Sequence, residues 1–332
     1  MSRANRRQFL LHTSKVLGGL AFVQATPRWA FGQPAAPTDL VERSFKTMGT
    51  EIKIAMPFRD FSNQCVERGF RSLQNINDGL TAHHASSVLS HLNAHPGDWI
   101  DDRYLFDVAE AAIRFGELTE GALDVTVLPA MKRLGFIPGT SLGTEQIDFT
   151  QLEVRNQKTR LRKEGFAADF GGIAKGYGVD QAIASLNLTA SESALIDAGG
   201  DIYAKGRPSA DRRWKVGISD PHQKGHLMAS LEIENEAIAT SGTYVQTRVF
   251  NGKEVSHIVD PRSGESVRRV LSATIVAPDT ITADALATAT TVMQPHAGQA
   301  LIASLPGVEG FWMYEDGSVF VSDGLKNRLT LY

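Results

Sequence analysis

The amino-acid sequence predicts an α+β fold with a largely antiparallel sheet and helices packed against it. Segments with the pattern of a strand outnumber those with helical spacing, and several of them pair as hairpins. The strongest hairpin signal is Asn251-Gly252, which separates strand-like segments at residues 244–250 and 254–259. Short strands joined by tight turns favour antiparallel pairing.

The first half of the chain is expected to contain few strands and two long helices. The predicted elements are, in order, a flexible linker at 33–44, a strand at 51–56, and helices at 63–80 and about 104–118. Residues 121–127 have the pattern of an apolar strand that contains Asp124. A buried carboxylate is costly unless something bonds it, so Asp124 is either a ligand contact or an acid at a strand edge.

The second half is expected to be rich in strands. A helix follows residue 178, with apolar residues at Val179, Ile183 and Leu186. After the helix we expect a buried strand running into a glycine turn at 194–201, strands at 214–218, 229–233, 237–240 and 271–277, helices at 282–293 and about 296–305, a hairpin around 315–317, and a C-terminal strand.

Composition excludes several classes of protein. The 332 residues carry a formal net charge of −3, which gives no reason to expect nucleic acid as a partner. The single cysteine, Cys65, excludes an internal disulfide and a metal site made of several cysteines.

The N-terminus has the plan of an export signal. Residues 1–32 combine a basic region containing Arg6 and Arg7 with an apolar run at 16–23 and a small-residue cleavage site near Gly32. The paired arginines favour the twin-arginine route. No later apolar run reaches the roughly 20 residues that a membrane span requires. We therefore expect a soluble periplasmic protein without stable membrane insertion.

A glycine-rich stretch at residues 169–178 is the first candidate for a binding site. It contains four glycines together with Asp169 and Lys175, and a helical pattern follows it. Glycines let a backbone approach a ligand closely, and the N–H groups at a helix start attract phosphates. A tight strand-to-helix turn without a ligand is the alternative, and the stretch alone does not decide between them.

Three closely spaced histidines suggest a metal site, but the surrounding residues do not support one. His83, His84 and His91 lie in a polar segment with no acid nearby to orient them. Solvated loop histidines are the preferred interpretation.

An acid and a hydroxyl share one face of a predicted helix. Asp284, Ala287 and Thr288 stand at positions i, i+3 and i+4. Carboxylate and hydroxyl oxygens, with main-chain carbonyls and phosphate oxygens, suit Mg²⁺. The alternative is an acid that favours the helix dipole and a threonine that bonds back to its own helix.

Several motifs occur together in the order and spacing of one family. They are Met48-Gly49-Thr50, residues 169–178, Thr240-Ser241-Gly242, the stretch at 256–261 that contains a His-x-x-Asp-Pro pattern, and residues 283–289. The chain resembles the ApbE family of FAD:protein FMN transferases over residues 45–332, nearly the whole mature chain. The resemblance implies an ApbE-like, T-fold-like architecture for this domain.

The resemblance also implies an activity. Enzymes of this family use Mg²⁺ and FAD, split the pyrophosphate of FAD, and transfer the FMN half to a threonine or serine hydroxyl of an exported or membrane flavoprotein, releasing AMP. The expected partners are therefore FAD and an acceptor flavoprotein.

The resemblance also assigns site residues, at the positions of this sequence that match the family's motifs. The resemblance assigns the metal to Asp284 and Thr288 and to main-chain oxygens near Gly172 and Ala287. It assigns flavin contacts to Met48, His83, Ala122, Leu123, Asp124, Asp169, Lys175 and Ile258. His257 becomes the base or the residue that positions the acceptor; the alternative is a strand histidine bonded to Asp260.

One segment departs from the family pattern, and two other functions stay open. At residues 83–93 the aromatic flavin-stacking position is His83, and Val88 replaces an acid. The alternatives are an exported protein that binds or stores FAD, and a Mg²⁺-dependent FAD pyrophosphatase that yields FMN and AMP.

Overall fold

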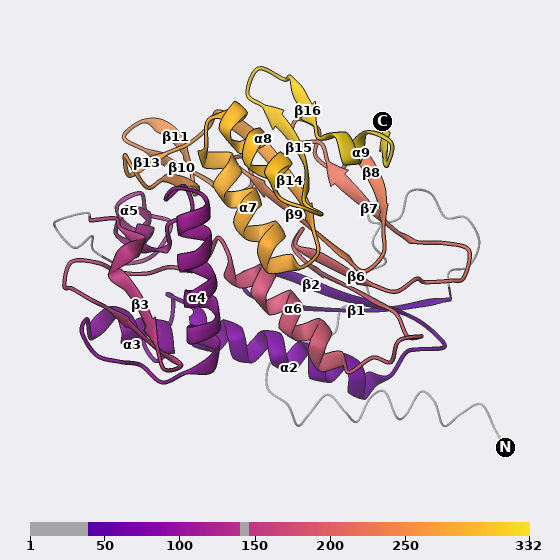
Figure 1. The fold of residues 1–332 in the computed structure, drawn as a ribbon, viewed down its shortest axis with the longest axis horizontal. Coiled ribbons are helices and arrows are strands. Elements are labelled where there is room, and N and C mark those ends of the chain that lie inside the picture. The colour runs from indigo at the N-terminus through magenta and orange to yellow at the C-terminus, as the bar shows by residue number, and fades with distance from the viewer. Residues whose placement is uncertain (1–38, 140–145) are drawn as a thin grey trace.

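The computed structural model describes residues 39–139 and 146–332. The chain forms a large sheet with helices on one face and a small second sheet on the other (Figure 1). The predicted signal peptide at 1–32 and residues 33–38 of the predicted linker lie outside the described residues.

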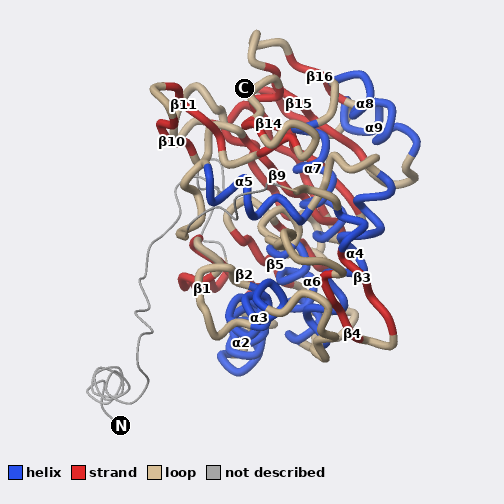
Figure 2. Tube along the Cα trace, turned by 90° about the vertical axis from the view of Figure 1, so that its left-hand side faces the viewer, coloured by secondary structure: helices blue, strands red, loops and turns tan. Residues whose placement is uncertain are grey.

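The large sheet has eight strands, and every neighbouring pair in it is antiparallel. In spatial order the strands are β1 (Leu40–Thr47), β2 (Thr50–Pro57), β5 (Ala194–Ala198), β6 (Ile202–Lys205), β9 (Glu236–Gly242), β14 (Val270–Ala277), β15 (Glu309–Tyr314) and β16 (Val319–Val321). Figure 2 shows them from β1 and β2 near helix α2 to β16 at the opposite end. The predicted α+β class with a largely antiparallel sheet is confirmed.

Strands in the middle of this sheet are buried on both faces. In β2, Ile54 belongs to the core under the helices, whereas its neighbour Ala55 belongs to the core under the second sheet. In β5, Ile196 and Leu195 divide in the same way. Successive side chains point to opposite faces of a strand, so both faces are covered by apolar layers. Every residue of β2 after Glu51 is accordingly buried.

Four helices cover one face of the sheet (Figure 1). They are α2 (Asn63–Leu80), α6 (Ala174–Leu186), α7 (Thr280–Val292) and α8 (Pro295–Ser304). Helix α2 has the predicted bounds because its apolar residues recur at helical spacing and Ser62 accepts a hydrogen bond from the Cys65 N–H at its start. Helix α6 packs against both α2 and α7, so the glycine-rich stretch, whose residues 174–178 form the start of α6, lies near α7.

The second sheet covers the other face. It consists of β17 (Leu329–Leu331), β8 (Leu227–Ile233) and β7 (Trp214–Ser219), with helix α9 (Asp323–Lys326) beside it. Trp214 is fully buried between the two sheets, which explains why a tryptophan opens this strand.

A smaller lobe between α2 and α6 in the sequence lies to one side of the sheet (Figure 1). Its elements are α3 (Val88–Ala94), α4 (Arg103–Leu118), η2 (Val125–Val127), α5 (Leu128–Arg133), η3 (Phe149–Gln151), β3 (Leu152–Arg155) and β4 (Lys158–Leu161).

Within the described ranges, no helix has the length and apolar character needed to cross a membrane.

Two short hairpins stand at the edge of this lobe. They are β10 (Thr247–Phe250) with β11 (Lys253–Ser256), and β12 (Val259–Asp260) with β13 (Glu265–Ser266). Asn251 and Gly252 have φ of 50° and 75°, the left-handed values that a two-residue turn of type I′ needs. The hairpin predicted at Asn251-Gly252 is confirmed.

Three local predictions differ from the structure. Strand β1 begins at Leu40, so the last residues of the predicted linker are paired with β2. Residues 121–127 contain no strand in the structure; the chain turns into η2 because the Asp124 side chain caps it. The histidine segment contains helix α3, which Ser87 caps by accepting from the Ser90 N–H.

Candidate active site

The site forms where the first turns of α6 and α7 cross. The Gly176 N–H on α6 donates a hydrogen bond to Asp284 Oδ2 on α7, at 2.9 Å. A Cβ at position 176 would lie 2.4 Å from the Thr280 carbonyl oxygen and 2.8 Å from the Asp284 Cβ. Glycine is therefore required at position 176 for the two helices to approach this closely.

Lys175 joins two buried carboxylates. Its Nζ forms an ion pair with Asp201 and lies 3.9 Å from Asp284 Oδ1. The side chains of Asp201 and Asp284 are only 2% and 3% exposed. Burial and then the charge of Asp284 raise the pKa of Asp201, although Lys175 opposes this. Burial by itself would lower the pKa of Lys175, but the two carboxylates outweigh burial and raise it, so the lysine stays protonated.

A second group of oxygens adjoins Asp284. Thr288, one turn further along α7, has its Oγ1 3.1 Å from Ser241 Oγ on β9. Gly172 lies against Thr288, since a Cβ there would be 3.0 Å from Thr288 Cγ2. The structure thus brings together Asp284, Thr288 and Gly172, three of the four predicted metal-binding positions. The fourth, the carbonyl of Ala287, accepts a hydrogen bond from the Thr291 hydroxyl at 2.8 Å.

The chemistry of these groups suits Mg²⁺. The donors are hard oxygens, from a carboxylate, a hydroxyl and the main chain, and two buried carboxylates face one lysine. A divalent cation there would offset the remaining negative charge. Among the described residues, no group of three or more His, Cys, Asp or Glu residues is placed to hold a metal. A cation at this site would therefore depend on main-chain and phosphate oxygens in addition to Asp284.

The glycine-rich stretch is held by the small lobe. The Asp169 N–H donates to the Val125 carbonyl at 2.7 Å, and the side chain of Asn93 bonds both the N–H and the carbonyl of Ala168. Burial raises the pKa of Asp169, while its bond from the Gly171 N–H and the charge of His83 lower it. The exposed His83 thus acts electrostatically on Asp169.

Met48 and Leu123 also reach the glycine-rich stretch. Met48 Sδ would lie 3.2 Å from a Cβ at Gly178, and Leu123 Cδ1 would lie 3.5 Å from a Cβ at Gly172. Met48 has φ of 53° and donates its N–H to the Asn77 side chain at 3.1 Å, which fixes the β1–β2 turn against α2. Two predicted flavin contacts thus converge on the stretch from different elements.

The Asp124 carboxylate is used within its own lobe. Its Oδ1 accepts from the N–H and the hydroxyl of Thr126 at 2.7 and 2.6 Å, and its Oδ2 accepts from the Phe149 N–H at 2.8 Å. These bonds satisfy the carboxylate without a ligand. They give Asp124 a structural role and place its neighbours, buried Ala122 and Leu123, at the edge of the site.

His257 follows strand β11 and continues its pairing with the chain before β10. The His257 N–H donates to the Gln246 carbonyl at 3.1 Å, and the ring Nδ1 lies 3.3 Å from the same oxygen. Burial, and to a smaller extent the charge of Lys175, lower the pKa of His257. Lys175 of α6 thus acts electrostatically on the imidazole, and the next residue, Ile258, is buried.

Two acids of the crossing were absent from the sequence prediction. Asp201 pairs with Lys175, and Asp180 on α6 accepts from the Thr280 and Ile281 N–H groups at 2.8 and 2.9 Å. An acid directly after the Gly199-Gly200 turn is a usable signal for Asp201. Asp180 gives no such signal, because an acid in a helix is ordinarily solvated.

Comparison with known proteins shows which family the chain matches. The ApbE family model matches residues 48–312. The chain is 32% identical over 292 residues to an FAD:protein FMN transferase of Treponema pallidum, covering 80% of this chain and 81% of that protein. It is 32% identical over 284 residues to an FAD:protein FMN transferase of Vibrio cholerae, covering 80% and 85%.

Solved structures agree with the sequence comparison. An ApbE protein of Thermotoga maritima superposes with a TM-score of 0.79 at 27% identity, covering 87% of this chain and 99% of that one. The flavin transferase ApbE from Vibrio cholerae superposes with a TM-score of 0.75 at 29% identity, covering 88% and 100%. The extent of the family match and the shared fold lead to one conclusion: the chain belongs to the ApbE family.

Proposed function

We propose that this protein transfers the FMN moiety of FAD to a threonine or serine hydroxyl of an acceptor flavoprotein, with release of AMP. The relatives from Treponema pallidum and Vibrio cholerae carry the name FAD:protein FMN transferase. The site residues of this chain supply the groups that such a reaction requires: a base, a cation site and a fixed lysine.

The contact between His257 Nδ1 and the Gln246 carbonyl oxygen, at 3.3 Å, is the observation that carries this proposal. A carbonyl oxygen only accepts hydrogen bonds, so the contact between Nδ1 and the Gln246 oxygen assigns the proton of the neutral ring to Nδ1. Nε2 then has a free lone pair. Because the pKa of His257 is lowered, the ring is neutral near pH 7 and able to accept a proton.

The cation of this proposal is Mg²⁺, held by Asp284, Thr288 and main-chain oxygens at Gly172 and Ala287. When bound, the ion would offset negative charge on the pyrophosphate of FAD. Lys175, held by Asp201, adds a fixed positive charge beside the same carboxylate. The flavin contacts of the proposal are Met48, His83, Ala122, Leu123, Asp124, Asp169, Lys175 and Ile258. Asp124 would contact the flavin through its main chain, because its carboxylate is bonded to Thr126 and Phe149.

The transfer step balances without any oxidant or reductant. The hydroxyl oxygen of the acceptor forms a bond to the phosphorus of the FMN phosphate. The bond from that phosphorus to the bridging oxygen of the pyrophosphate breaks, and the bridging oxygen leaves with AMP. The hydroxyl proton passes to Nε2 of His257. A phosphoanhydride is thereby exchanged for a phosphoester on the acceptor.

The proposed acceptor is an exported or membrane flavoprotein, and the proposed location is the periplasm. Both rest on the twin-arginine signal predicted at residues 1–32, since that route carries folded proteins out of the cytoplasm.

Incubation with FAD, Mg²⁺ and a candidate acceptor flavoprotein tests the proposal. Denaturing electrophoresis should reveal covalent flavin fluorescence on the acceptor, with an equal amount of AMP released. An acceptor whose hydroxyl residue is replaced by alanine serves as the control and should stay unlabelled. Free FMN and AMP without labelling would instead identify a pyrophosphatase. Unchanged FAD would identify a binding or storage protein.

A further inference from the structure

Helices α6 and α7 cap each other at the site. Helix α6 begins after Ile173, which offers no capping side chain, and its Gly176 N–H is satisfied by Asp284 of α7 instead. In return, Asp180 of α6 accepts the Thr280 and Ile281 N–H groups at the start of α7. Each helix thus supplies a carboxylate to the other helix's free N–H groups.

The geometry of this exchange is close and reciprocal. Gly176 and Asp180 are four residues apart on one face of α6, and Thr280 and Asp284 are four residues apart on one face of α7. The facing pairs bond crosswise over 2.8 to 2.9 Å. A rotation or a slide of α7 would therefore break bonds at both ends of the crossing.

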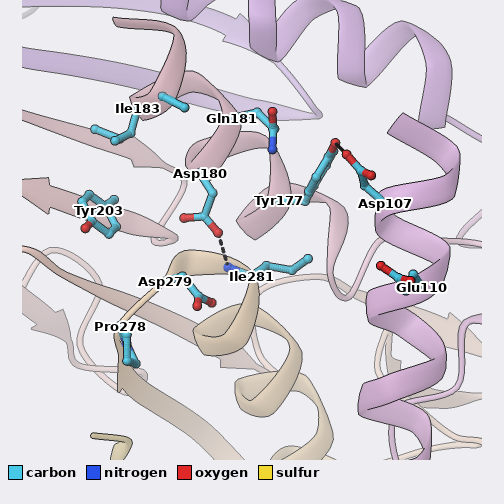
Figure 3. Close-up of a pocket in the computed structure, with 11 residues that line it drawn as sticks. Asp107, Glu110, Tyr177, Asp180, Gln181, Ile183, Tyr203, Pro278, Asp279 and Ile281 are labelled. Atoms are coloured by element: carbon cyan, nitrogen blue, oxygen red, sulfur yellow. Dashed lines mark hydrogen bonds between the residues drawn. The ribbon is translucent and has the colours of Figure 1, made fainter. Parts of the chain in front are cut away.

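Asp180 acts on α7 alone and at a distance from the proposed metal ligands. Its two oxygens take the first two N–H groups of α7, while the third, Thr282 N–H, is taken by Asp279 of the same helix at 2.9 Å. Figure 3 shows the Asp180 carboxylate aimed at the first turn of α7, with the bond to Ile281 marked. Asp279 therefore caps α7 by a bond within the same segment, whereas Asp180 connects the first turn of α7 to α6.

The side of the crossing that carries Asp180 is open. A pocket of about 520 Å³ adjoins it, lined among others by Asp107, Asp180 and Asp279, and it includes none of the predicted flavin or metal residues. Helix α7 also packs on β9 and β14, and the two bonds to Asp180 tie its first turn to α6 as well.

We infer that Asp180 is a positioning residue, which sets the distance of Asp284 and Thr288 from the glycine-rich stretch by fixing the first turn of α7 to α6. The inference rests on the proposed function, because it concerns the proposed cation site. Residues that orient metal ligands typically change metal affinity about 10–100-fold when they are replaced. We expect an effect in this range.

The test measures Mn²⁺ binding to the full protein by electron paramagnetic resonance, without FAD and without acceptor. In Asp180→Asn one oxygen is replaced by an NH₂ group that faces a helix N–H, so one of the two bonds is lost. We expect its dissociation constant for Mn²⁺ to rise at least about tenfold. Asp279→Asn is the matched control: it removes the same charge at the start of α7 but keeps an amide oxygen that caps Thr282, and it touches no bond to α6, so its affinity should stay within about twofold of the wild type.

Equal affinities for the wild type and Asp180→Asn would overturn the inference, as would equal losses in Asp180→Asn and Asp279→Asn. Should Asp180→Asn not fold, as judged by its circular dichroism, Asp180→Glu replaces it under the same criteria, since it keeps both oxygens but shifts them by one methylene group. A wild type that binds no Mn²⁺ also overturns the inference. The transfer of FMN, measured separately, decides the proposed function.

Discussion

Three buried carboxylates, with Lys175 among them and Lys53 beside Asp197, give the site its chemical character. Asp197, Asp201 and Asp284 are each at most 5% exposed, and all three act electrostatically on Lys175. Asp197 accepts the Gly200 N–H at 2.8 Å, which holds the turn before Asp201. A buried excess of negative charge is unfavourable by itself. It is consistent with a residue set adapted to a cation.

His257 leads to a prediction about pH. Because burial lowers its pKa below the ordinary 6.5, the acidic fall of kcat/KM should have its midpoint below pH 6.5. As the pH falls through that pKa, the ring gains a proton and no longer accepts one from the acceptor hydroxyl. His257→Asn should lower the transfer rate by about 10²–10⁴-fold and remove this fall. The initial rate of acceptor labelling, measured over pH 5–8 for both proteins, gives the rate loss and the midpoint of the acidic fall.

The control for this prediction is His222→Asn, which replaces an exposed histidine and should leave the profile unchanged. If His257→Asn kept the wild-type rate at neutral pH, the proposed base would be wrong.

Thr288 leads to a prediction about cation dependence. Thr288→Val keeps the shape of the side chain but removes the hydroxyl, so the Mg²⁺ concentration for half-maximal transfer should rise about tenfold. Ser241→Ala removes only the partner at 3.1 Å and should have a smaller effect. Equal effects in the two variants would mean that the hydroxyl of Thr288 serves the bond to Ser241 and not the cation. A titration of the initial rate with Mg²⁺ separates these outcomes.

At the scale of secondary-structure elements, the crossing of α6 and α7 decides where the site forms. Both helices start at this crossing, so their N–H groups and the positive ends of their dipoles point toward it. That field favours the carboxylates of Asp180 and Asp284 and, on the side of the glycine-rich stretch, a phosphate.

The closeness of the crossing leads to a prediction about Gly176. In Gly176→Ala, the new methyl group would meet the Thr280 carbonyl oxygen at 2.4 Å, so the helices must move apart. The free energy of unfolding should fall by about 1–3 kcal/mol, as is typical of overpacking. Chemical denaturation monitored by circular dichroism measures the loss.

Gly79→Ala is the matched control. Gly79 also lies inside a helix, α2, but a Cβ there has no neighbour within 4 Å. Alanine favours helix over glycine by up to about 1 kcal/mol, so this variant should be as stable as the wild type or more stable. A Gly176→Ala protein of wild-type stability would show that the crossing tolerates wider separation.

At the scale of the whole molecule, the large sheet is covered on both faces, and the site lies on the helical face beside the small lobe. The helices and the second sheet bury successive side chains of the same strands. Elements far apart in the sequence therefore hold fixed positions around the α6–α7 crossing: the β1–β2 turn with Met48, and the lobe with Asp169 and Leu123.

Burial of acids gives a prediction for the stability of the whole protein. Burial raises the pKa of Asp180 to about 6, although bonds from the Ile281 and Thr280 N–H groups oppose this. The folded state then binds the proton more tightly than the unfolded state, whose Asp pKa is about 3.9. This contribution to stability is complete below about pH 4 and is lost as the pH rises through 6. The Tm of the wild type should therefore fall between pH 5 and pH 7.5.

Melting curves of Asp180→Asn at pH 5 and pH 7.5, compared with those of the wild type, isolate the contribution of Asp180. The variant lacks the titrating group, so its Tm should change less between these pH values than the Tm of the wild type. Parallel changes in both proteins would assign the pH dependence to other buried acids, such as Asp169 or Asp197, whose pKa values burial also raises.

The sequence by itself determined the elements whose signals are local. Helix α2 and the β10–β11 hairpin are fixed by helical spacing, a capping serine and an Asn-Gly turn, all of which act within a few residues. The family also followed from the sequence, because its motifs are contiguous stretches. The strand expected at 121–127 was wrong because the Asp124 carboxylate caps a turn at Thr126, two residues on, and also binds Phe149, which lies 25 residues away.

The tertiary structure decided which side chains meet. The pairing of Lys175 with Asp201, the contact of Gly172 with Thr288 and the exchange of caps between α6 and α7 join residues that are 26 to 116 positions apart. Such bonds depend on how the helices pack on the sheet, and no local pattern encodes the packing. The sequence identified Asp284 and Thr288 as candidate ligands. Only the tertiary structure shows that Gly176 bonds Asp284 and that Ser241 bonds Thr288.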